Sequence, residues 1–275
     1  MMLRLVPQSI KEIWRYRELL LLLISRNLKV RYRGSALGFF WSLLNPLLQV
    51  AVFVVVFKYI MDLKEENFAF KVLFCYMAWM FFLQTVLDGT VSVAENIQIV
   101  RTTYFPRVLL PLATLGSNLF HFCLVGVIFI TIFWVHPVHV PLRCALAVPL
   151  FVLLQMMLML GVLLILASLS ALYSDVRFVA TTFLNLWFFL TPIIYSARQA
   201  LASERAHEWM KVAFTLNPLT PIMAAYRSLL LEGWRHLPFE GFWESLAACV
   251  GTTVVLLVIG MVVFWRLQWR FPEQA

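Results

Sequence analysis

Charged residues are scarce in this chain. Asp, Glu, Lys and Arg make up only 13% of its 275 residues, whereas 62% are hydrophobic. Soluble domains carry about 25% charged and about 45–50% apolar residues. A water-soluble core of this size cannot enclose so much apolar surface, which excludes a soluble globular protein. The composition predicts an integral membrane protein whose apolar surface faces lipid.

The sequence also lacks the short motifs of common catalytic sites. It contains no GxxxxGKS/T phosphate loop, HExxH helix or GxSxG turn, and its four cysteines form no CxxC pair. We therefore expect no catalytic residue, no metal site and no ATP binding through a phosphate loop in this chain.

Acidic groups are almost missing from the apolar segments. Asp88 is the best candidate, and we place it near the cytoplasmic end of its segment rather than at mid-membrane. Carriers coupled to protons or sodium usually need carboxylates or broken helices near the middle of the membrane. Their scarcity predicts a transport protein that another component drives.

What the sequence does contain is a series of long apolar segments, which predict an all-α integral membrane fold in one domain, residues 1–275. Six transmembrane helices are expected, at 36–60, 69–93, 108–135, 142–172, 178–195 and 245–266. Between the last two, segment 196–244 holds only short apolar stretches, which do not reach the roughly 17 residues that a span needs. We expect re-entrant or interfacial helices there, on the extracytoplasmic side.

The basic residues gather in short flanks of these segments. The first 35 residues hold eight Lys or Arg, whereas the first opposing loop, Asp62–Lys71, holds two. Cytoplasmic flanks of membrane proteins carry such an excess, so both termini, including tail 267–275, are expected in the cytoplasm. The same bias explains the net charge of +8 without any nucleic-acid partner.

Residues 1–35 are too polar to cross a bilayer. Their apolar side chains recur at steps of mostly three and four, which indicates one stripe along a helix over Ser9–Arg33. The stripe consists of Ile10, Ile13, Trp14, Leu20, Leu21, Ile24 and Leu28. This pattern predicts a basic amphipathic helix in the cytoplasmic membrane interface.

Four stretches resemble a known family, the ABC-2 type permeases, in the same order along the chain. The first is Ser25–Pro46 (SRNLKVRYRGSALGFFWSLLNP), which is most similar to the branch that exports O-antigen, teichoic acid and related surface polysaccharides. The others are Arg101–Pro111 (RTTYFPRVLLP), Tyr173–Arg177 (YSDVR) and Asn217–Leu230 (NPLTPIMAAYRSLL).

This resemblance implies a homodimer in the bacterial inner membrane that works with two copies of a separate ATPase subunit, which binds ATP and Mg²⁺. It further implies two contact regions with that ATPase. The segment after the second span would act as a coupling helix through Glu95, Asn96, Arg101, Tyr104 and Arg107. The N-terminal interface helix would contact both lipid and ATPase through Trp14, Arg15, Arg26, Arg31 and Arg33.

Aromatic residues are dense, at 15% of the chain. They can be lipid-facing bulk or an interfacial belt, or they can line a conduit in which sugar rings slide over flat faces. For the conduit we expect Phe39, Trp41, Asn45, Trp79, Phe82, Gln84, Trp187, Phe188 and Tyr195.

The leading functional hypothesis is export of a lipid-linked, O-antigen-like polysaccharide. The nearest alternative is an ABC-2 permease for a drug or small lipid. A non-ABC membrane enzyme or scaffold is a third class. Titratable groups clustered at one membrane depth would support an enzyme, and the sequence shows none.

Overall fold

The computed structural model describes residues 12, 14–33, 39–63, 65, 67–133, 142–202, 207–231 and 237–271. Every regular element within them is a helix, which confirms the all-α prediction. The long elements are α2 (Arg17–Tyr32), α3 (Phe39–Phe53), α4 (Phe68–Val91), α6 (Leu109–Phe133), α7 (Leu142–Ser170), α8 (Val176–Leu190) and α12 (Phe242–Leu267). The short ones are η1 (Val54–Ile60), η2 (Ala94–Asn96), α5 (Ile97–Thr102), α9 (Ala197–Ala202), α10 (Glu208–Leu216), α11 (Leu219–Leu231) and η3 (Gln268–Arg270).

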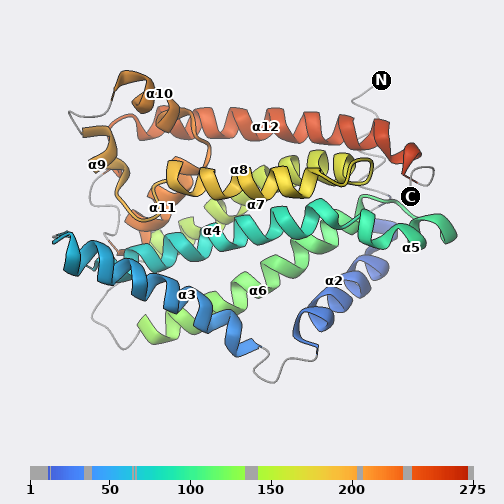
Figure 1. The fold of residues 1–275 in the computed structure, drawn as a ribbon, viewed down its shortest axis with the longest axis horizontal. Helices are drawn as coiled ribbons and strands as arrows, with labels where there is room; N and C mark the ends of the chain where they lie inside the picture. The colour runs from blue at the N-terminus through green and yellow to red at the C-terminus, as the bar shows by residue number, and fades with distance from the viewer. Residues whose placement is uncertain are drawn as a thin grey trace.

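The two ends of the molecule carry different elements (Figure 1). α2, α5 and the last turns of α12 lie at one end, and α9, α10 and α11 lie at the other. The long helices α3, α4, α6, α7, α8 and α12 run between these ends. We refer to the first as the α5 end and to the second as the α10 end.

Five helical stretches are long and apolar enough to cross a membrane: Phe40–Ile60, Phe68–Val91, Leu109–Ile128, Leu146–Ser170 and Phe242–Arg270. The fifth predicted span, 178–195, is shorter than expected, because α8 ends at Leu190 after 15 residues. Such a helix is about 22 Å long, less than the ~30 Å hydrocarbon core. Thr191 precedes Pro192 and is extended, as the clash with a following proline ring requires.

The central helix is α4, which packs against α3, α6, α7, α8 and α11. It is the most enclosed of the five apolar stretches. Trp79 and Phe82 of α4 are almost fully buried in the main hydrophobic core. Helix α7 packs closely against α12, since a Cβ on Gly161 would lie 2.7 Å from the Leu256 backbone.

The N-terminal helix differs from its predicted stripe. Leu23, which the stripe omitted, is buried, and it joins Leu20 and Ile24 in a small core at the α5 end. Leu21, which the stripe included, is exposed. Gly116 of α6 allows close approach, since a Cβ there would lie 2.7 Å from Ile24 Cδ1. These residues pack the first half of α2 against the helix bundle, while Ile10 and Ile13 lie outside the described residues.

Candidate functional site

Two cavities lie next to each other on the α2 side of α4. The larger, about 720 Å³, is a groove at the α5 end between α2, α4, η2 and α6, and Arg177 of α8 also lines it. The smaller, about 270 Å³, lies between α3, α4 and α6. Arg31 and Gln84 line both cavities. These two side chains therefore stand at the boundary between a polar groove and a more apolar cavity.

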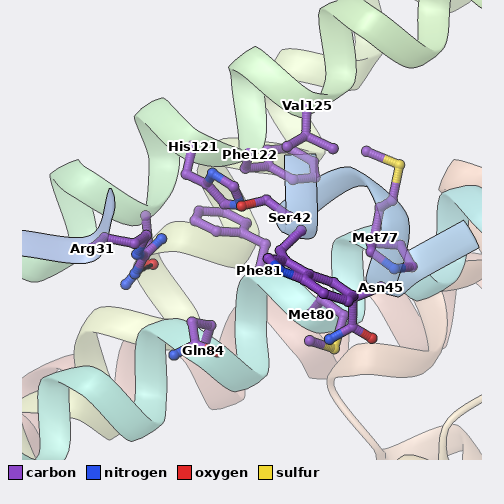
Figure 2. Close-up of a pocket in the computed structure, with 13 residues that line it drawn as sticks. Arg31, Ser42, Asn45, Met77, Met80, Phe81, Gln84, His121, Phe122 and Val125 are labelled. Atoms are coloured by element: carbon purple, nitrogen blue, oxygen red, sulfur yellow. Dashed lines mark hydrogen bonds between the residues drawn. The ribbon is translucent and has the colours of Figure 1, made fainter. Parts of the chain in front are cut away.

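The smaller cavity has a polar and an apolar part (Figure 2). Arg31 from α2, Gln84 from α4 and His121 from α6 approach it at one end. The opposite end is formed mainly by apolar side chains, among them Met77, Met80, Phe122 and Val125. A ligand in this cavity would meet hydrogen-bonding groups on one side and flexible thioethers and rings on the other.

A cluster of four side chains, the Arg31 cluster, lies where the two cavities adjoin. Arg31 donates to Asp88 Oδ2 at 2.8 Å and to Asn118 Oδ1. Asn118 donates to the same Asp88 oxygen at 3.3 Å, and Gln84 donates to Asp88 Oδ1 at 2.7 Å. The cluster joins α2, α4 and α6 through one partly buried ion pair, whose Arg31 and Asp88 side chains are 23% and 33% exposed.

The residue after Arg31 adds a second link to α6. The Tyr32 hydroxyl and His121 Nδ1 lie 2.7 Å apart, and the two rings are tilted by 48°. Two consecutive residues at the end of α2 thus bond to α6, although the sequence showed only a basic run there.

The predicted coupling segment forms a short helix, α5, that ends before the next long helix begins, as expected. Val100 and Phe105 turn inward into the small core at the α5 end. Glu95, Arg101 and Tyr104 turn outward, and Tyr104 is 89% exposed. The buried pair therefore fixes the segment and leaves an exposed face for a partner.

The other two predicted coupling residues bond within the chain. Asn96 accepts a hydrogen bond from Arg26 Nη2 at 2.7 Å, which ties η2 to α2. The Arg107 guanidinium lies 6.0 Å from the centres of the Trp269 and Phe271 rings, within cation–π range. Both residues thus contact other parts of the chain at the α5 end.

The predicted interface-helix residues fall into two groups. Arg26 and Arg31 point into the groove. Trp14, Arg15 and Arg33 are exposed, and the Arg17 guanidinium lies 5.3 Å from the centre of the Trp14 ring. The exposed group remains available to lipid or to a partner.

The predicted conduit residues separate in a similar way. Trp41, Asn45 and Gln84 line the smaller cavity. Trp79 and Phe82 are only 2% and 0% exposed, so they lie inside a single chain rather than on a surface. Phe39 belongs to α3, but the structure describes only its backbone.

The remaining conduit candidates are held at the α10 end of α8. Phe188 packs edge-on against Trp79, with 5.6 Å between ring centres. Trp187 Nε1 donates to Asn217 Oδ1 at 3.0 Å, and the Tyr195 hydroxyl donates to the Phe189 carbonyl at 2.8 Å. These rings help to brace α8 and the segment that follows it.

Sequence reasoning missed a second ionic cluster, at the α10 end. Glu65, from the loop before α4, bonds Arg227 Nη2 of α11 at 2.6 Å and Lys71 Nζ of α4 at 3.2 Å. We call these three residues the Glu65 cluster. Burial alone would raise the pKa of Glu65, but Arg227 and Lys71 outweigh it and hold that pKa below 4.5, its ordinary value. The only sequence signal for this cluster is that Arg227 is a single charged residue within an apolar stretch.

The fold and cavities define a multi-pass membrane protein with two neighbouring cavities between its helices. The described residues contain no group of three or more His, Cys, Asp or Glu side chains that could hold a metal ion.

Comparison with known proteins identifies the class further. The ABC-2 type transporter family matches residues 18–231, and the chain belongs to this family. It is similar to an O-antigen export system permease protein RfbA of Myxococcus xanthus, at 31% identity over 272 residues and 99% of both chains. Two proteins of the same name from Klebsiella pneumoniae are 29% and 26% identical, over 93% of this chain and 94% of each relative. The predicted resemblance is thereby confirmed.

Proposed function

We propose that the chain is the permease subunit of an ABC exporter that moves a lipid-linked, O-antigen-like polysaccharide across the bacterial inner membrane. The observation that carries this proposal is the similarity over 99% of the chain to a relative named as an O-antigen export permease. The multi-pass helical fold supports it, because such a fold supplies a path through the bilayer.

Two copies of the chain would work with two copies of an ATPase subunit, which supplies the ATP and Mg²⁺ site. The missing phosphate loop in this chain supports a separate ATPase. Both termini, the α5 segment and the 173–177 turn are proposed to be cytoplasmic. The common position of α2, α5 and the end of α12 at one end supports that orientation. A cysteine at position 101 that reacts with an impermeant reagent from outside intact cells would contradict it.

The outward face of α5 is the proposed ATPase contact. Replacing Glu95, Arg101 and Tyr104 together by Ala should weaken co-purification with the ATPase, while the inward Val100 and Phe105 keep the segment folded. The matched control is Glu208→Ala with Lys211→Ala, an exposed pair at the opposite end. If the triple variant retains as much ATPase as the control, the contact lies elsewhere.

The smaller cavity is proposed to form part of the sugar conduit within one subunit. A polysaccharide is rich in hydroxyl groups and needs substitutes for water as it crosses hydrocarbon. Trp41 offers a flat face for sugar C–H groups, and Asn45 and Gln84 offer hydrogen bonds at the cavity wall. We expect Trp41→Leu to reduce export, whereas Phe120→Leu, an exposed ring outside the cavity, should not. Equal export by both variants would remove Trp41 from the conduit.

The proposed function is tested by deleting the gene and measuring surface polysaccharide. Loss of the surface polymer, accumulation of lipid-linked polymer inside the cell and recovery with the intact gene are the expected results. Unchanged surface polysaccharide together with a lost drug or small-lipid export activity would favour a different ABC-2 substrate.

A further inference from the structure

We infer that the Arg31 cluster is a lock that keeps the groove at the α5 end separate from the cavity between α3, α4 and α6. The inference rests on the proposed transport function but assigns a role to Arg31, Asp88 and Asn118, which the proposed function leaves unassigned. Opening the lock would join the two spaces into one path that starts at the α5 end.

The position of the cluster is the first argument. Arg31 and Gln84 line both cavities, Asp88 lines only the groove, and Asn118 lines only the smaller cavity. The hydrogen bonds among these four residues therefore cross the boundary between the two spaces. These four side chains therefore stand where the two spaces adjoin inside the chain.

The strength of the cluster is the second argument. Arg31 and Asp88 remain 23% and 33% exposed, so water can replace each partner when the pair separates. Partly buried pairs of this kind contribute less to stability than the breaking of a fully buried pair would cost. Such a pair can open and close within a working cycle without unfolding the helices that carry it.

The connection of the cluster to α5 is the third argument. Arg26, on the same helix as Arg31, bonds Asn96 beside α5 at 2.7 Å. The two arginines are five residues apart, which is about 7.5 Å along a helix. A displacement of η2 and α5 by a partner would pull on Arg26 and move Arg31 with it. Arg31 is thus a positioning residue that links the exposed face of α5 to the cavity boundary.

The test measures access to the smaller cavity and needs neither substrate nor ATPase. Ser42, which lines that cavity, is replaced by Cys in a chain whose four native cysteines are changed to Ala. Inside-out membrane vesicles are then treated with a water-soluble maleimide. We expect Asp88→Asn and Arg31→Gln to speed labelling about threefold to fivefold. Each variant removes the ion pair that favours the closed state of the boundary.

Lys29→Gln is the matched control, since it removes a positive charge from an exposed position on the same turn of α2. Membrane abundance and the size-exclusion profile establish that each variant folds. Labelling of Asp88→Asn and Arg31→Gln at the Lys29→Gln rate would overturn the lock.

The charge-swapped double variant, Arg31→Asp with Asp88→Arg, should label more slowly than either single variant. Labelling as fast as the single variants would show that the ion pair does not close the boundary. Because no export is measured, these results are independent of which molecule the permease moves. If the labelling results are as expected but the protein exports no polysaccharide, the proposed function is refuted and the lock is not.

Discussion

Two ionic clusters sit at opposite ends of α4, and they are built differently. The Glu65 cluster, at the α10 end, is closed off from solvent, with side chains that are 7–13% exposed. The Arg31 cluster, at the α5 end, borders two cavities and is 23–33% exposed in its ion pair. Each cluster ties α4 to an element that does not run the length of the bundle: α11 in one case, and α2 in the other.

Because of this difference in burial, we interpret the Glu65 cluster as a brace and the Arg31 cluster as a movable contact. Removing one partner of a buried pair leaves an uncompensated charge in a low-dielectric site, so the intact cluster holds α11 and the loop before α4 in place. A partly exposed pair exchanges its partner for water at small cost. We therefore expect the α10 end to be rigid and the α5 end to move when the ATPase acts.

The largest expected effect is at the brace. Glu65→Ala leaves Arg227 and Lys71 without their shared carboxylate, and it should lower the free energy of unfolding by about 3–5 kcal/mol. Thermal unfolding in detergent measures the loss. Glu208→Ala is the control, because its pair with Lys211 is exposed, and it should change little. Equal melting temperatures for the two variants would contradict the brace.

Acid should weaken the same brace less severely, since a protonated carboxyl keeps its shape. The pKa of Glu65 in the folded chain lies below its ordinary value of 4.5. Its contribution is therefore fully present above about pH 4.5 and is lost as the pH falls through the lower folded pKa. The gap in melting temperature between the parent chain and Glu65→Gln should narrow over this range. A constant gap would show that the charge of Glu65 is not what stabilises the cluster.

A network of neutral hydrogen bonds around Asn217, also at the α10 end, allows the contribution of the charged Glu65 cluster to be compared with that of uncharged contacts. Asn217 accepts from Trp187 Nε1 at 3.0 Å and from the Leu219 backbone N–H at 3.1 Å, and it donates to Leu190 O and Thr191 Oγ1. Asn217→Ala should cost about 2 kcal/mol, since it leaves buried donors and acceptors unpaired. Gln268→Ala, which loses one exposed hydrogen bond, is the control in the same thermal measurement. A loss as large as that of Glu65→Ala would mean that the ions are not the main brace.

The smallest effect on stability is expected at the lock. Asp88→Asn should change the free energy of unfolding by about 1 kcal/mol or less, because its pair with Arg31 is partly exposed. The same detergent melting experiment measures it beside Glu65→Ala. A loss of melting temperature as large as that of Glu65→Ala would remove the distinction between the two clusters.

The long helices could be predicted from the sequence because runs of about 20 apolar residues have few alternatives in a membrane protein. α4 begins at Phe68 and ends at Val91, within two residues of the predicted 69–93. The end of α8 at Leu190 follows from Pro192, whose effect on the preceding residue is local. The predicted segment 178–195 continues past Pro192, whereas the helix ends before it.

The site was less predictable, because side-chain partners far apart in the sequence have no local signal. Arg31 and Asn118 are 87 residues apart, and Glu65 and Arg227 are 162 residues apart. Aromatic residue type alone also failed to separate Trp41 at the cavity from Trp79 in the core, because both occur in apolar runs. On α2, Leu19–Leu23 is uniformly leucine, so periodicity could not tell that Leu23 rather than Leu21 packs against the bundle.

The central claim is that this chain moves a lipid-linked polysaccharide when a separate ATPase hydrolyses ATP. The most direct measurement uses proteoliposomes that contain the permease, its ATPase and the lipid-linked polymer, with a lectin that detects polymer crossing the bilayer. We predict crossing only when both proteins and Mg²⁺-ATP are present, and no ATP hydrolysis by the permease alone. Polymer crossing without the ATPase would contradict the account. So would a failure of the polymer to cross while both proteins together hydrolyse ATP and move a small lipid instead.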